Sequence, residues 1–166
     1  MATKTMDDLF LDAVKDIYYA ERKIIAALKK MSRGARDETL KLAFDKHLEE
    51  TEGQVERLVQ VFDLLGKPAR GKTCPAIDGL IEEGQEILEE FKGSDALDAG
   101  LLAAAQAVEH YEIARYGALK SWAMQLGKNE IAKLLEETLL EETKTDRALT
   151  QLAEASVNAK GKGKAA

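Results

Sequence analysis

Four glutamates lie at positions where a helical sequence is expected to bury apolar side chains. With about 100° between successive residues, Glu21, Glu112 and Glu142 fall near the centres of apolar stripes, and Glu50 falls at the edge of one. Each lies near the middle of its predicted helix, so the four meet at one level in an antiparallel bundle. Burying an unpaired ionised carboxylate is costly. A compensating charge is therefore expected beside them: protons, the guanidinium of Arg115, or two divalent cations.

Further polar side chains lie one helical turn from these glutamates. Residues three or four apart share a helix face and can reach the same cavity. The pairs are His47 with Glu50, Glu50 with Gln54, Glu109 with Glu112, and Glu142 with Asp146. Di-iron and di-manganese bundles use a Glu from each of two helices and paired ligands from the other two. The spacing therefore favours metal, and we expect Gln54 to hydrogen-bond a metal ligand.

An internal repeat relates the two halves of the chain. The segment Leu-Glu-Glu-Thr at residues 48–51 recurs at residues 140–143, which aligns Gln54 with Asp146. Glu21 aligns with Glu112 when residues 28–29 are laid on residues 119–120. The repeat predicts two related helical hairpins.

The elements that must position these side chains are long helices separated by clusters of breaker residues. Glycine, serine and proline cluster near residues 32–34, 66–75, 93–94 and 127. They predict helices over residues 6–31, 35–65, 94–126 with Ser94 as N-cap, and 129–157, with a weaker helical pattern over residues 77–91. Short links make each hairpin antiparallel, whereas a link of about 28 residues can return the chain along the whole bundle.

The predicted fold is all-α: a ferritin-like four-helix bundle with one long crossover that contains a short extra helix. Residues 1–157 form the bundle, and residues 158–166, a lysine-bearing segment rich in Gly and Ala, are expected to be a disordered tail.

Composition excludes several classes of protein. The 166 residues are 45% hydrophobic and 33% charged, with a formal net charge of -6 and no apolar run of bilayer length. We therefore expect no membrane partner, and an acidic body disfavours nucleic acid. The single cysteine, Cys74, forms no internal disulfide or cysteine metal cluster, and residues 1–6 contain no apolar leader. These features predict a cytoplasmic protein.

Five segments make the sequence similar to a known family, the YciE/YciF group of ferritin-like bacterial stress proteins. The segments are residues 16–21 (DIYYAE), 47–51 (HLEET), 54–58 (QVERL), 109–112 (EHYE) and 141–146 (EETKTD). The resemblance covers nearly the whole chain before the lysine tail. It implies a rubrerythrin-like di-metal centre, a stress-related role and a homodimer. Carried onto this chain, the metal ligands are Glu21, Glu50, Glu112 and Glu142, with His47, Glu109 and Asp146 as further candidates.

The chain departs from the wider ferritin pattern in its histidines. A Glu-x-x-His motif would place histidines at Gly53 and Thr145, and neither position has one. A carboxylate-rich, imidazole-poor site favours iron or manganese over copper or zinc. We therefore expect two divalent ions, Fe or Mn, as cofactors.

Other polar residues receive simpler interpretations. His110 points roughly opposite Glu112 and is expected at the surface. Glu136, Glu137 and Glu141 are interpreted as solvated helix charges. Tyr18 and Tyr116 fall on inner arcs, where they either pack or supply a hydrogen bond or an electron to the centre. No residue is assigned a catalytic role.

The residue pattern and the family resemblance together give three hypotheses for the function. The leading hypothesis is a di-metal stress protein that reacts with peroxide or dioxygen, as a peroxidase, catalase or ferroxidase, or that handles iron. The alternative is a non-catalytic structural or adaptor dimer whose carboxylates are protonated or paired with Arg115. In the third hypothesis, Lys160, Lys162 and Lys164 contact DNA. This is the weakest of the three, because so few lysines would give only weak, salt-sensitive binding.

Overall fold

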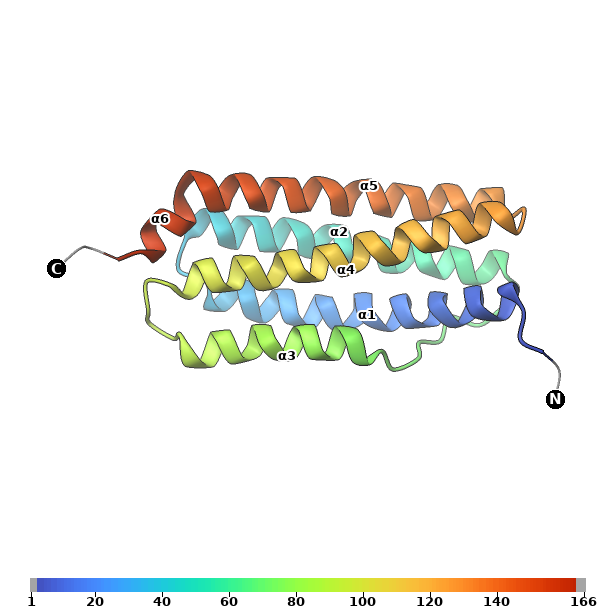
Figure 1. Ribbon diagram of the computed structural model, residues 1–166, viewed down its shortest axis with the longest axis horizontal. Coiled ribbons are helices and arrows are strands. Elements are labelled where there is room, and N and C mark those ends of the chain that lie inside the picture. Colours follow the sequence, from blue (N-terminus) through green and yellow to red (C-terminus); the bar gives the residue numbers. More distant parts are fainter. Residues whose placement is uncertain (1–2, 164–166) are drawn as a thin grey trace.

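The computed structural model describes residues 3–163, and all regular structure in this part of the chain is helical (Figure 1). Four long helices form the bundle: α1 (Met6–Gly34), α2 (Glu38–Leu64), α4 (Leu97–Gln125) and α5 (Asn129–Leu152). A shorter helix, α3 (Pro75–Glu90), packs outside the bundle against α1 and α4. The predicted ferritin-like four-helix bundle, with one long crossover containing an extra helix, is confirmed.

The crossover determines the direction of the second hairpin. Helices α1 and α2 are antiparallel, as are α4 and α5, and the crossover with α3 returns the chain so that α2 and α4 run the same way (Figure 1). Lys72 N donates to Lys15 O at 3.1 Å and ties the crossover to α1. Two glycines allow α3 to pack closely: a Cβ at Gly34 would lie 2.3 Å from a Leu88 methyl carbon, and one at Gly100 would lie 2.8 Å from Ile87 Cγ2.

Side-chain caps explain where the first two long helices begin. Thr5 caps α1 in a reciprocal box with Asp8, whose backbone N–H donates to Thr5 Oγ1 and whose carboxylate accepts from Thr5 N. Asp37 caps α2 by accepting from the N–H groups of Thr39 and Leu40. Helix α2 therefore begins three residues after the predicted Ala35.

The start of α4 also differs from the prediction. Ser94 Oγ accepts from Ala96 N at 3.1 Å in a turn, and the helix begins only at Leu97. The Asp98 carboxylate in its first turn accepts from the backbone N–H groups of Arg36 and Asp37, at 2.8 and 2.7 Å. This carboxylate joins the α1–α2 loop to the second hairpin.

The C-terminal segment differs from the expected disordered tail where the structure describes it. Helix α5 continues through a π-helical turn, η1 (Ala153–Val157), into a short helix, α6 (Asn158–Gly161). Lys160 in α6 forms an ion pair with Asp37. Lys164, one of the lysines considered for DNA contact, lies outside the described residues.

Within residues 3–163, no helix is both long and apolar enough to cross a membrane.

Two glycine substitutions should have opposite effects on stability. Gly127 has φ +69°, and a Cβ there would meet no atom within 4 Å, so Gly127→Ala should cost about 1 kcal/mol through backbone strain alone. Gly117 lies inside α4 with equally open surroundings, so Gly117→Ala should add roughly 0.5–1 kcal/mol. Urea unfolding of both variants and wild type measures the difference, and two changes of the same sign would contradict this account.

Candidate metal centre

Six buried polar side chains from all four bundle helices converge in the middle of the bundle. Each is at most 3% exposed. They are Glu21 of α1, His47 and Gln54 of α2, Glu109 and Glu112 of α4, and Glu142 of α5. We call this set the buried cluster. Each helix contributes because its apolar stripe continues above and below these positions and turns the same face inward.

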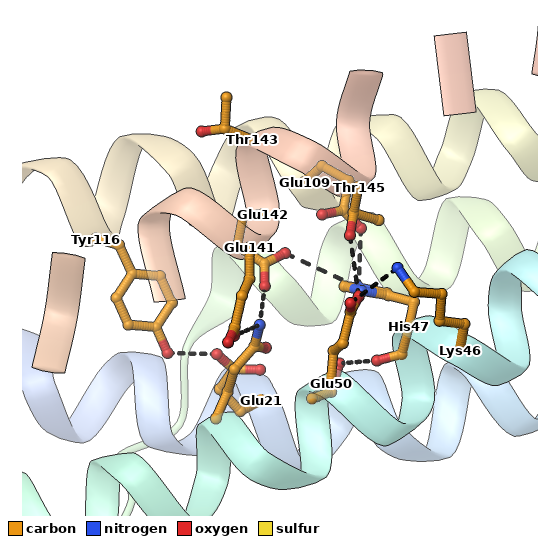
Figure 2. Close-up of polar contacts among 12 residues, drawn as sticks. Glu21, Lys46, His47, Glu50, Glu109, Tyr116, Glu141, Glu142, Thr143 and Thr145 are labelled. Carbon is orange, nitrogen blue, oxygen red and sulfur yellow. Dashed lines mark hydrogen bonds and ion pairs between the residues drawn. The ribbon is translucent and has the colours of Figure 1, made fainter. Parts of the chain in front are cut away.

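Four members of the buried cluster lie close enough to share one ion. One ligand atom from each of His47, Glu109, Glu112 and Glu142 lies within 4.8 Å of the others. His47 Nε2 is 2.9 Å from Glu109 Oε1 and 4.0 Å from Glu142 Oε2, and Figure 2 shows the His47 ring directed toward Glu142.

Hydrogen bonds hold two of the carboxylates in place. The Tyr116 hydroxyl donates to Glu21 (Figure 2), and the Gln54 amide donates to Glu142. The same Gln54 nitrogen also donates to Glu141, at 3.0 Å. The predicted role of Gln54, a hydrogen bond to a candidate ligand, is therefore observed.

Sequence reasoning missed the network that orients Gln54. Arg57 donates to both carboxylate oxygens of Glu141, at 2.9 and 3.0 Å, and to Thr138 Oγ1 at 2.6 Å. The sequence pattern predicts a solvated charge at Glu141, whereas its carboxylate joins Arg57 to Gln54. The available signal was Arg57 itself, a cation one turn beyond Gln54 on the same helix.

The buried cluster contains most of the unpartnered polar atoms in the described chain. Nine buried side-chain nitrogen or oxygen atoms make no hydrogen bond, and eight of them belong to the buried cluster. Both Glu112 oxygens and His47 Nδ1 are among them, as is His47 Nε2, whose one close polar neighbour is Glu109 Oε1 at 2.9 Å. Buried polar groups normally have partners. Carboxylate oxygens with one imidazole suit a hard or borderline divalent cation, so this donor set fits iron or manganese.

Burial shifts the protonation of the carboxyl groups. Burial, followed by the charge of Glu142, raises the pKa of Glu21 to about 8. Burial raises the pKa of Glu109 to about 7 and raises the pKa values of Glu112 and Glu142 well above the ordinary 4.5. Without a cation, the cluster therefore keeps protons that carboxyl groups in water lose.

Two candidate ligands lie outside the buried cluster. The Glu50 side chain is 25% exposed, with Oε1 2.9 Å from Lys46 Nζ and Oε2 accepting from Thr145 Oγ1 at 3.2 Å. Asp146 is 20% exposed and its Oδ1 lies 3.1 Å from His110 Nε2. We expect one buried carboxylate from each of the four helices, but the four buried carboxylates come from three: Glu109 and Glu112 both belong to α4, and Glu50 of α2 is partly exposed.

Two surface interpretations have different outcomes. His110 lies at the surface, as expected, with its side chain 69% exposed. Arg115, a possible compensating charge because its position falls within the apolar stripe predicted for its helix, is instead exposed, and its guanidinium carbon lies 5.3 Å from the centre of the Tyr111 ring. Pairing with Arg115 therefore does not neutralise the buried carboxylates.

The fold and the buried cluster together define a class: ferritin-like helical bundles with a carboxylate-rich centre. The family model described as "Domain of unknown function (DUF892)" matches residues 5–162, so the chain belongs to this family. Protein YciF of Escherichia coli (strain K12) is 47% identical over 166 residues, which cover 99% of this chain and 100% of that protein. The resemblance to the YciE/YciF group is thus confirmed.

Solved structures agree with this assignment. The E. coli stress protein YciF has a TM-score of 0.89 at 47% identity, covering 94% of this chain and 99% of that one. YcfI of Rhodopseudomonas palustris, whose description suggests a structural role, has a TM-score of 0.86 at 49% identity, covering 89% and 94%. A Xanthomonas campestris pv. campestris protein shares the fold, with a TM-score of 0.74 at 23% identity over 93% and 94% of the two chains.

The metal-free protein should lose stability as the pH rises from about 5 to about 8. Carboxyl groups of the unfolded chain lose protons near pH 4.5, whereas Glu109 and Glu21 of the folded chain keep them to about 7 and 8. The folded state binds more protons in this window, so each such proton removes up to about 1.4 kcal/mol of stability per pH unit. Urea unfolding in the presence of a chelator measures the slope.

A matched pair of variants tests the source of this slope. Glu112→Gln, which is permanently neutral, should flatten it, whereas Glu82→Gln, at an exposed position of α3, should leave it unchanged. Wild-type stability that increases from pH 5 to pH 8 would contradict the assignment of raised pKa values.

Proposed function

We propose that this chain binds two divalent metal ions, iron or manganese, in the buried cluster and handles iron or reacts with peroxide or dioxygen. The observation that supports the proposal is the convergence, at one level of the bundle, of eight buried nitrogen and oxygen atoms that make no hydrogen bond. If these atoms had no further partner, their burial in an apolar core would carry a large desolvation penalty. Cations between them remove that penalty.

The proposed ligands follow from proximity. His47, Glu109, Glu112 and Glu142 form the compact set that would hold one ion. Glu21 lies within the electrostatic influence of Glu112 and Glu142 and would hold the second ion together with them. Glu50 and Asp146 remain proposed ligands whose side chains would have to turn inward.

Bound iron or manganese would supply Lewis acidity and electrons for reaction with peroxide or dioxygen. The chain supplies the surroundings. The Tyr116 hydroxyl donates a hydrogen bond to Glu21 and would hold that carboxyl group in position, and burial raises the pKa of Tyr116, so the phenol keeps its proton. Gln54 orients Glu142, and buried apolar side chains such as Ile17, Phe62 and Leu119 exclude bulk water.

Two further proposals concern the setting of this function. The E. coli relative of known structure is called a stress protein. We propose a stress-related role in the cytoplasm for this chain. We also propose that the chain forms a homodimer, as the family resemblance implies.

Metal loading tests the central proposal. Protein expressed in iron- or manganese-supplemented medium should contain about two ions per chain by inductively coupled plasma mass spectrometry. Glu112→Gln and Glu142→Gln should each remove at least one ion, because each deletes a carboxylate charge from the cluster. Glu130→Gln, an exposed position on the same helix as Glu142, is the control and should retain full loading.

Wild-type protein that contains no metal after growth in supplemented medium would contradict the proposal. Unchanged metal loading of both cluster variants would also contradict it. Added Mn(II) should also raise the melting temperature, since a ligand specific for the folded state stabilises it.

A second candidate function is a structural or adaptor dimer without catalysis. The description of the R. palustris relative favours it. In this case the carboxyl groups remain protonated, as their raised pKa values permit. The melting temperature would then be the same with and without Mn(II), while sedimentation would still show a dimer.

A further inference from the structure

One cavity reaches the buried cluster from the surface. It has a volume of about 50 Å³, lies between α2, α4 and α5, and has His47 and Glu109 at its inner end. Lys46, with a side chain 59% exposed, and the exposed Ala148 line its outer end. A larger cavity of about 180 Å³ between α1, α3 and α4 is lined by none of the cluster side chains.

An ion pair occupies the outer end of this cavity. Glu50 also lines the cavity and its side chain is 25% exposed, with one carboxylate oxygen 2.9 Å from Lys46 Nζ and the other accepting from Thr145 Oγ1 (Figure 2). Among the residues that line the cavity, Lys46 alone carries a fixed positive charge. Its ammonium group neutralises the carboxylate that an entering cation would meet first.

The size of the cavity sets what can pass. Its volume accommodates only a few water-sized molecules, so a hydrated divalent cation must exchange most of its water for protein oxygens. A free carboxylate at the entrance would assist that exchange, and a carboxylate bound to an ammonium group would not.

We propose that this cavity is the entry port for divalent cations and that the Lys46–Glu50 pair acts as its gate. The inference rests on the proposed function, since it needs a cluster that binds metal. Opening of the gate separates Lys46 from Glu50 and leaves the Glu50 carboxylate facing the incoming ion. Lys46 thus limits the rate of metal entry without contributing a ligand.

Stopped-flow uptake of Co(II) by the metal-free full-length chain tests this proposal, with Co(II) absorbance as the readout in place of activity. Lys46→Gln should accelerate uptake about threefold to tenfold, because Glu50 loses its ion-pair partner. Lys41→Gln is the matched control: Lys41 lies on the same helix and pairs with Glu38 at 2.6 Å, but does not line the cavity. It should keep the wild-type rate.

Ala148→Phe provides an independent test in the opposite direction. A phenyl group at the cavity mouth should slow uptake about tenfold or more and leave the final stoichiometry unchanged. Ala114→Phe, at an exposed position of α4 that does not line the cavity, is its control. Circular dichroism and thermal melting confirm that all four variants fold.

The outcomes separate the two proposals. If wild type binds Co(II) but Lys46→Gln and Ala148→Phe take it up at the rates of their controls, the port is overturned and the metal site stands. If metal-free wild type takes up no Co(II), the port and the proposed function both fail.

Discussion

The desolvation of four carboxyl groups in the middle of the bundle is the constraint on which the rest of the structure depends. Glu21, Glu109, Glu112 and Glu142 are at most 1% exposed, and each would be charged in water at neutral pH. Their burial requires either protons or cations. Tyr116 and Gln54 relieve part of the cost with hydrogen bonds, but most of the carboxylate oxygens in the cluster have no donor. This imbalance distinguishes the centre from an ordinary buried ion pair.

Helix phase explains which parts of the site sequence reasoning could predict. The apolar stripes of α1 and α5 are clear, so the burial of Glu21 and Glu142 follows from their positions within them. Helix α4 is less clear: its pattern places Glu112 correctly in the core but also places Arg115 there, and Arg115 is exposed. The stripe of α2 contains polar residues, so its apolar positions do not define the centre of the buried face sharply. Each step of one residue turns the side chain by about 100°, so a small error in that centre changes which polar residue is expected to be buried. His47 and Gln54 consequently face the core, while Glu50 lies at its edge.

Contacts between distant helices explain most of what could not be predicted. The carboxylate of Glu141 looks like a surface charge from its own helix and becomes part of the site only through Arg57 and Gln54 of α2. The internal repeat misled in a related way, because it aligns Glu50 with Glu142 although their burial differs. The fold itself was predictable because link lengths alone fix which helices are neighbours. Helix ends were less so, since Asp37 and Asp98 act through specific backbone hydrogen bonds.

The placement of α3 makes the two sides of the molecule unequal in thickness. This helix packs only on α1 and α4, so a second layer of chain covers that side of the bundle (Figure 1). Its close seat on Gly34 and Gly100 leaves little space between the layers. The flank formed by α2 and α5 has a single layer within the described residues. Two layers of helix therefore separate the interior from solvent beside α1 and α4, and one layer separates it from solvent beside α2 and α5.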